Sequence, residues 1–197
     1  MLSSIHPLGE RSRQQRFWLT ATAYLGGSTV SGAALGLGLG LLGSWLRPDR
    51  IGDSAALAAL AAVAAAGLVH DVRPGGFHLA TPRRQVDENW LTTYRGWVYG
   101  AGFGLQLGVG VATIITSGLI YLMWSAALLS GRLTAGLAIG ATFGAVRGTA
   151  LLTVARVSTP EQLHATHRRI DRLRRGAGRV SMAALALGAI VTAVAAV

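Results

Sequence analysis

Long apolar blocks alternate with short polar stretches that carry arginine. The apolar blocks cover residues 17–46, 54–69, 96–130, 133–155 and 180–197, and none of them contains an aspartate or glutamate. A helix needs about 20 apolar residues to cross a bilayer core of about 30 Å. The pattern therefore predicts an all-α integral membrane protein, a bundle of five transmembrane helices.

Two of these blocks depart from the length that one crossing needs. Block 54–69 is short, whereas block 96–130 has 35 residues. At about 1.5 Å per residue, a helix of that length exceeds a core of about 30 Å. Block 96–130 is therefore tilted, broken, or extended beyond the membrane. The apolar pattern does not decide between one helix and a broken one.

The composition agrees with a membrane protein. Hydrophobic residues make up 51% of the chain and charged residues 13%, and the mean hydropathy is +0.46. A soluble domain has about 25% charged residues. We therefore expect a basic arm at residues 1–16, followed by a single transmembrane helical domain at residues 17–197. The chain has no cysteine, which excludes disulfides and thiolate metal sites.

The arginines are unevenly shared between the two sides of the predicted bundle. Fourteen lie in the arm 1–16 and the polar loops 70–95 and 156–179, and only three lie in the connections on the opposite side. Positive residues accumulate in cytoplasmic loops. This bias predicts a cytoplasmic N-terminus and an outside C-terminus for a cell membrane protein, which we expect to be prokaryotic. It also accounts for the net charge of +10 without a nucleic-acid partner.

Short motifs recur at a nearly constant offset. Arg16-Phe17-Trp18 and Arg95-Gly96-Trp97 are 79 residues apart, and Thr81-Pro82 and Thr159-Pro160 are 78 apart. Each unit would be a polar segment followed by a two-helix hairpin, as in parallel-repeat transporters. We expect two parallel hairpin repeats plus one helix; the alternative is chance matching in apolar sequence.

Glycines recur at every fourth position in three of the predicted spans. Small residues at this spacing form a stripe along which two membrane helices approach closely. We interpret ten of them as helix-packing residues: Gly32, Gly36, Gly40, Gly100, Gly104, Gly108, Gly136, Gly140, Gly144 and Gly148.

Arg147 is the only charged residue within block 133–155. Placing an arginine at the bilayer centre costs between about 2.5 and 17 kcal/mol, depending on the reference state. Helical geometry places Arg147 between Gly136 and Gly140 in azimuth, on the packed side of the helix. Its side chain either extends towards the cytoplasmic interface or binds an anionic group, from a ligand or from a partner helix. Gln106 is the second intramembrane candidate, as an interhelical hydrogen-bonding residue or a ligand contact.

The basic loop 156–179 has the pattern of an amphipathic helix on an anionic leaflet. Thr159 is the expected N-cap and Pro160 the first helical residue. Four potential metal ligands share one face of this helix: Glu161, His164, His167 and Asp171. Four ligands from one surface helix do not converge on a tetrahedral ion. We therefore predict no metal and no cofactor.

Aromatic residues gather near the predicted ends of the spans. Trp18, Trp90, Tyr94, Trp97 and Tyr99 lie at the cytoplasmic ends of blocks 17–46 and 96–130. Tryptophan and tyrosine are enriched where a membrane meets water, so this cluster indicates an interfacial belt.

Two functional hypotheses follow. No nucleophile–base pair or phosphate-binding loop is present, so we do not expect an enzyme. The first hypothesis is a small transporter or permease-like protein, in which Arg147 attracts an anionic group with Gln106 nearby. The alternative is a non-catalytic accessory or assembly subunit that packs, through its glycine faces, against a partner membrane subunit or another copy of itself.

Overall fold

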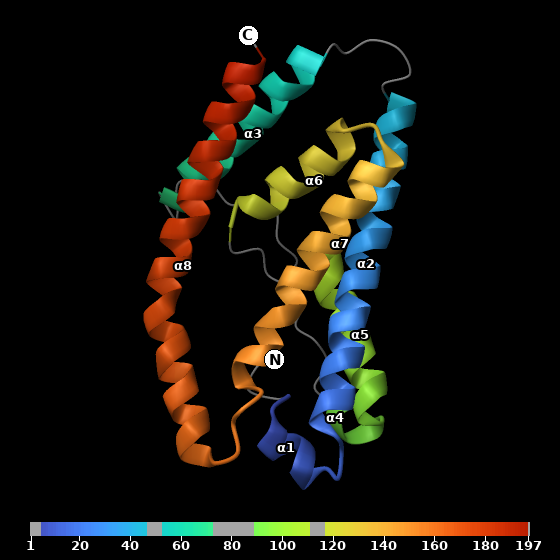
Figure 1. Cartoon of the computed structure of the whole chain (residues 1–197), viewed down its shortest axis with the longest axis vertical. Coiled ribbons are helices and arrows are strands. Elements are labelled where there is room, and N and C mark those ends of the chain that lie inside the picture. The colour runs from blue at the N-terminus through green and yellow to red at the C-terminus, as the bar shows by residue number, and fades with distance from the viewer. Residues whose placement is uncertain (1–4, 47–52, 73–88, 111–116, 197) are drawn as a thin grey trace. The chain divides into compact units, whose positions relative to one another are not determined.

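The computed structural model describes residues 5–46, 53–72, 89–110 and 117–196, and all regular structure in these ranges is helical. The elements are shown in Figure 1. Their bounds are α1 Pro7–Ser12, α2 Phe17–Leu46, α3 Asp53–Val72, α4 Trp90–Thr93, α5 Gly96–Val109, α6 Leu119–Leu129, α7 Leu133–Thr149, the 3₁₀ helix η1 Ala150–Val154, and α8 Pro160–Ala195. The all-α prediction is confirmed for the described residues.

Within the described residues, four stretches are long and apolar enough to cross a membrane, whereas the sequence predicts five. They are Phe17–Leu46, Ser54–Val72, Leu133–Val154 and Pro160–Ala195. The chain is therefore a multi-pass membrane protein. The first stretch has the bounds expected from the sequence, and the second and third lie within a few residues of theirs.

Block 96–130 is not one helix within its described residues. It contains α5, of 14 residues, and α6, of 11 residues, each too short to cross a bilayer alone. α5 ends at Gly110, whose φ of 76° is readily adopted by glycine and rarely by other residues. The Gly110 N–H donates to the Leu107 carbonyl at 3.0 Å, which closes the last turn. Residues 111–116 lie outside the described part.

The expected boundary between the amphipathic loop 156–179 and the last span lies inside one helix. α8 runs for 36 residues from Pro160 to Ala195, so the polar and apolar halves are continuous in the helix. Thr159 caps this helix as expected, because its hydroxyl accepts from the Gln162 N–H at 3.3 Å. Most of the predicted loop 70–95, including Thr81-Pro82 of the proposed repeat, lies outside the described residues.

The chain divides into two compact units. Unit 1 comprises Met1–Gly32, Pro82–Ile114 and Ala141–Arg174, and unit 2 comprises Ala33–Thr81, Ile115–Gly140 and Arg175–Val197. Helices α2, α7 and α8 each contribute residues to both units.

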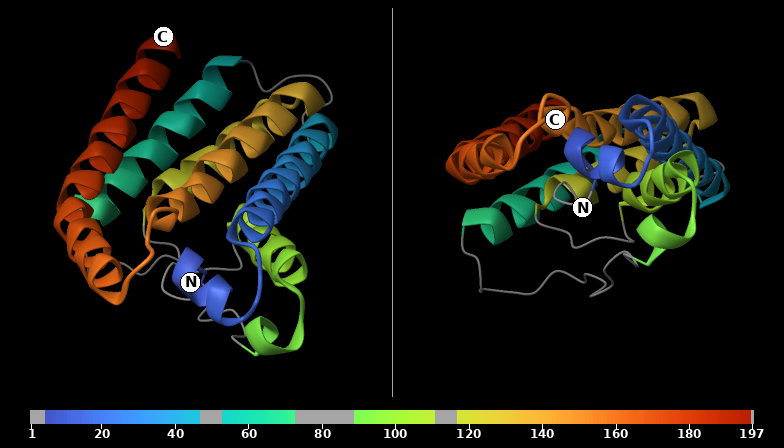
Figure 2. Two further views of the ribbon diagram at one scale, coloured as in Figure 1. Left: turned by 60° about the horizontal axis from the view of Figure 1, so that its bottom comes forward. Right: turned by 90° about the horizontal axis from the view of Figure 1, so that it is seen from below.

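Unit 1 has a core of large side chains. Phe17, Tyr24, Tyr99, Phe103 and Leu151 are buried in it. In unit 2, α3 lies beside the C-terminal half of α8 in both Figure 1 and Figure 2, and Leu185 of α8 is fully buried. Gly67 of α3 approaches both Leu185 and Gly118.

Candidate functional site

Arg147 lies near the end of α7, inside the apolar stretch Leu133–Val154. Seven residues separate it from Val154, which is a rise of about 10 Å along the helix. The side chain is half-buried and its Nη1 atom is shielded from solvent. The guanidinium carbon lies 5.3 Å from the centre of the Phe143 ring, within the range of a cation–π contact. The guanidinium thus lies over an aromatic ring of its own helix.

Gln106 is half-buried in α5. Among the residues described by the structure, no hydrogen bond joins Gln106 to Arg147. Asp71 accepts hydrogen bonds from Ser117, Gly118 and Ser181. The expected pairing of Arg147 and Gln106 in one ligand site stays a prediction.

The glycines of α5 lie against the first half of α2. A Cβ at Gly100 would lie 2.5 Å from the Thr20 carbonyl oxygen. At Gly104 it would collide with the Tyr24 carbonyl oxygen, and at Gly108 with that of Ser28. α2 also contributes a glycine to this contact, because a Cβ at Gly27 would lie 2.5 Å from the Ala101 carbonyl oxygen. The two backbones therefore touch, as small-residue packing requires.

The glycines of α7 contact α2 in each unit. In unit 1, a Cβ at Gly144 would collide with the Ser28 carbonyl oxygen, and one at Gly148 would meet Leu25. Ser28 also donates to the Gly144 carbonyl at 2.7 Å.

In unit 2 the same kind of contact continues along the two helices. A Cβ at Gly36 would collide with the Gly136 carbonyl oxygen, and a Cβ at Gly136 would collide with that of Gly36. Gly140 also lies next to Gly36. A Cβ at Gly40 would lie 2.6 Å from the Arg132 carbonyl oxygen. Gly32 is buried. These glycine faces are used inside the chain.

The N-terminal arm contains a buried carboxylate that the sequence did not predict. Glu10 of α1 has no exposed surface. Its carboxylate accepts from Tyr99 Oη at 2.5 Å, Thr20 Oγ1 at 2.7 Å and Arg13 Nη2 at 2.9 Å. Arg13 thereby forms an ion pair with Glu10. The arm 1–16, expected to be a simple polar tail, is instead attached to α2 and α5.

Two further bonds fix the arm. Gln15 Oε1 accepts from the Gly96 N–H at 2.9 Å, at the start of α5. His6 caps α1, because its Nδ1 accepts from the Gly9 N–H at 3.1 Å. Burial disfavours the charged imidazole, and Arg13 repels it, so the pKa of His6 is lowered from its ordinary value of 6.5. A histidine cap of this kind requires the neutral ring.

A second carboxylate joins three elements of unit 2. Asp71, at the end of α3, accepts from Ser117 Oγ at 2.8 Å and the Gly118 N–H at 3.0 Å, at the start of α6. Ser181 of α8 donates to the same carboxylate at 3.3 Å and lies 2.5 Å from Ser117 Oγ. The sequence signal was present, since Asp71 directly follows an apolar span, but its partners lie 46 and 110 residues away.

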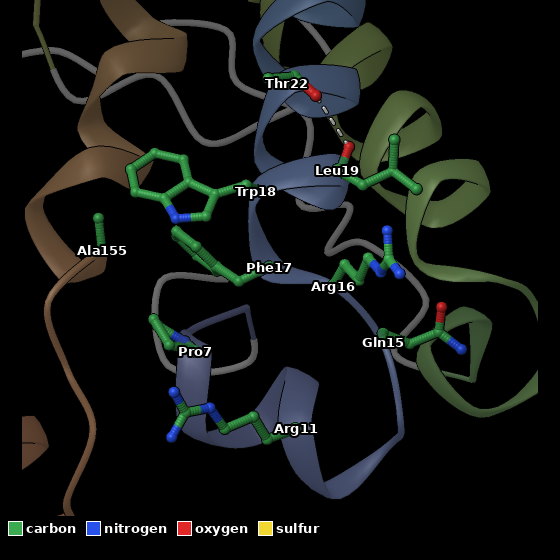
Figure 3. Close-up of a pocket in the computed structure, with 9 residues that line it drawn as sticks. All are labelled: Pro7, Arg11, Gln15, Arg16, Phe17, Trp18, Leu19, Thr22 and Ala155. Atoms are coloured by element: carbon green, nitrogen blue, oxygen red, sulfur yellow. Dashed lines mark hydrogen bonds between the residues drawn. The ribbon is translucent and has the colours of Figure 1, made fainter.

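A pocket of about 720 Å³ lies at the base of α2 in unit 1 and is drawn in Figure 3. Its polar lining includes Arg11, Gln15 and Arg16. Neither Arg147 nor Gln106 lines it. In the described part of the chain, no group of three or more histidine, aspartate or glutamate side chains is arranged to hold a metal ion.

Comparison with known proteins shows a similarity to three MauF proteins. Methylamine utilization protein MauF of Methylorubrum extorquens is 30% identical over 154 residues, which are 75% of this chain and 51% of that protein. MauF of Paracoccus versutus is 30% identical over 143 residues, and MauF of Methylophilus methylotrophus is 32% identical over 129. The chain is similar to MauF.

The similarity to MauF covers 72% of this chain for the Paracoccus versutus protein and 64% for the Methylophilus methylotrophus protein. An alignment of this extent includes several of the long apolar helices. The chain spans about half the length of the MauF proteins that it matches. No protein-family model matches the chain. No solved structure matches it.

Proposed function

We propose that this MauF-like chain is a non-catalytic accessory membrane protein that serves methylamine utilization by assembling with another membrane protein. The similarity to three MauF proteins carries the proposal, because their names assign them to methylamine utilization. This is the accessory alternative from the sequence, and it replaces the permease-like hypothesis as the better supported of the two.

The charge of the intramembrane site argues against transport of methylamine by this chain. A primary alkylamine, like the lysine side chain, is protonated at neutral pH. Arg147 is the only charged residue within block 133–155, and it is positive. An arginine held at depth repels a methylammonium ion. A path lined by this residue would exclude the substrate that the relatives' name suggests.

The glycine contacts refine how the chain would assemble. Gly36, Gly104 and Gly144 already contact backbone within this chain. We therefore propose that a partner does not use these faces, in place of the packing through glycine faces that the sequence suggests. A partner would bind the outer surfaces of the helices, and another copy of the chain would do the same.

The chain would have its N-terminus in the cytoplasm, which follows from the fourteen-to-three arginine bias. The absence of cysteine allows a direct test. Ser12→Cys and Ser158→Cys, at exposed positions, should react with a membrane-impermeant maleimide only after the cells are opened. Thr134→Cys should react in intact cells. The reverse labelling pattern would refute the orientation.

The function is tested by deleting the gene in its host. Growth with methylamine as the nitrogen source should fail, and growth with ammonium should be normal. A tagged copy should restore growth and should recover a membrane partner in fixed proportion when it is purified in mild detergent. Unimpaired growth of the deletion strain on methylamine would remove the link to its utilization.

A reconstitution experiment separates the accessory role from a permease. Purified chain in liposomes should take up neither labelled methylamine nor labelled anions. Uptake that is lost in Arg147→Gln and kept in Arg132→Gln, an exposed arginine at the start of the same helix, would restore the permease hypothesis.

A further inference from the structure

The pocket at the base of α2 lies where the polar arm meets the first membrane helix. α2 begins at Phe17, and the residues before it belong to the arm 1–16. The pocket of about 720 Å³ is lined from both sides of this junction, by Arg11, Gln15 and Arg16 of the arm and by Phe17, Trp18 and Leu19 of α2. Figure 3 shows these side chains around the base of the helix. The lining of the pocket therefore combines polar and apolar side chains.

The polar part of the lining carries positive charge that no acidic residue in the described part of the chain pairs with. Arg11 and Arg16 are both exposed, and no acidic residue lines the pocket. Glu10, the acidic residue next to Arg11, is buried and bonded to Tyr99, Thr20 and Arg13. Within the described ranges, neither Arg11 nor Arg16 forms an ion pair. Two guanidinium groups without counterions favour an anion, and they suit phosphate oxygens in particular.

The apolar part of the lining matches a hydrocarbon chain at the membrane surface. Phe17 is buried and contacts Trp18 edge to face, with ring centres 5.4 Å apart. Trp18 is 62% exposed and Leu19 52% exposed at the start of a membrane helix. An exposed tryptophan in this position is typical of the interface between membrane and water. A free phosphate ion would leave this half of the pocket without a partner.

We propose that this pocket binds an anionic phospholipid. The phosphate binds Arg11, and the glycerol and first acyl carbons lie against Phe17 and Trp18, which Figure 3 shows on the same side of the helix base; Arg16 adds positive charge from the opposite side. The bonds of Glu10 hold α1 on α2 and α5, so that Arg11 is positioned before the lipid arrives. The site is separate from the basic half of α8, and the inference does not rest on the role in methylamine utilization.

The test measures lipid binding to the purified full chain in a neutral detergent. Phosphatidylglycerol with brominated acyl chains is titrated, and quenching of tryptophan fluorescence reports its binding. Phosphatidylcholine with the same brominated chains measures the contribution of the hydrocarbon alone. Phosphatidylglycerol should bind about tenfold more tightly, the effect expected from one or two charge-assisted hydrogen bonds. Trp18→Phe should remove most of the quenching.

Matched arginine variants locate the site. Arg11→Gln combined with Arg16→Gln should abolish the tenfold preference for phosphatidylglycerol. Arg168→Gln combined with Arg169→Gln removes the same charge from two exposed residues of α8 and should keep the preference. Circular dichroism and gel filtration check that each variant is folded. The two single substitutions in the arm are measured as well, so that a misfolded double variant does not end the test.

Three results would overturn the proposal. The first is equal binding of phosphatidylglycerol and phosphatidylcholine. The second is an unchanged preference in the folded arm variants, or a loss of preference in the α8 variant alone. The third is displacement of the lipid by inorganic phosphate at a similar concentration, which would assign the pocket to the free ion.

Discussion

Replacing Glu10 should release the N-terminal arm from the membrane helices. Glu10→Ala removes the acceptor for two hydroxyl groups, those of Tyr99 and Thr20. Both residues are fully buried, so water cannot replace the lost acceptor. The arm should then open far more often, while the glycine contacts between α2 and α5 remain.

The destabilisation expected for Glu10→Ala follows from the two hydroxyl donors, those of Tyr99 and Thr20, that lose their acceptor. A buried donor left without an acceptor costs about 1–3 kcal/mol. Thr20 retains a long bond to the Arg16 carbonyl at 3.4 Å, which reduces its share. The lost ion pair adds little, because Arg13 is partly exposed. We therefore expect about 2–4 kcal/mol for Glu10→Ala, and about 1–2 kcal/mol for Glu10→Gln, which keeps one acceptor oxygen.

Trypsin measures this opening directly, because the arm contains arginines at 11, 13 and 16. When opening and closing are fast, the cleavage rate follows the population of the open form. A destabilisation of 2–4 kcal/mol corresponds to cleavage that is about thirtyfold to several hundredfold faster. Mass spectrometry identifies the cut sites in the detergent-solubilised protein.

The control is Glu161→Gln, which removes an exposed carboxylate from the first turn of α8. Its cleavage in the arm should match that of the unaltered protein. Tyr99→Phe should accelerate cleavage less than Glu10→Ala, because it removes a donor and strands none. A change of less than threefold in Glu10→Ala would refute the claim that this carboxylate holds the arm.

Three further predictions concern the helix contacts and the cap of α1. Gly27→Ala should lower thermal stability by about 1–3 kcal/mol because its Cβ meets backbone, whereas Gly26→Ala, with open space, should be neutral or stabilising. The lowered pKa of His6 means that folding favours its neutral ring; the protection factors of the α1 amides, which correct for the intrinsic exchange rate at each pH, should therefore fall as pH drops below 6.5, and His6→Asn should remove this dependence. Asp71→Asn should cost about 1–3 kcal/mol in thermal unfolding, and an unchanged melting temperature would contradict the role of this carboxylate in joining α3, α6 and α8.

The sequence was most informative where a physical rule acts locally. Apolar length alone predicts the bounds of α2, and four-residue glycine spacing indicates which faces of α5 and α7 approach a neighbour. The capping residue Thr159 is likewise a local signal. The break after α5 was less clear, because glycine is frequent throughout the apolar blocks and only the positive φ distinguishes Gly110.

The polar contacts were not predictable because they depend on residues far apart in sequence. In the sequence, Glu10 is a single negative charge in a short basic arm. Only the fold brings it to Tyr99, which lies 89 residues away in sequence. The continuous helix α8 was also unexpected, because a change from arginine-rich to apolar sequence at residue 180 resembles the entry into a membrane. Helical hydrogen bonding does not require that boundary, so composition and secondary structure need not change at the same residue.

The two described carboxylates that join helices share a property that bears on function. Glu10 and Asp71 each accept three hydrogen bonds, mostly from hydroxyl and backbone donors. Their negative charge is therefore committed to holding helices together, while exposed arginines such as Arg11 and Arg16 keep their positive charge. A chain with this arrangement attracts anionic lipids and acidic surfaces and repels small cations. Under the proposed accessory function, this positive charge disfavours methylammonium and favours a negatively charged protein surface as the membrane partner.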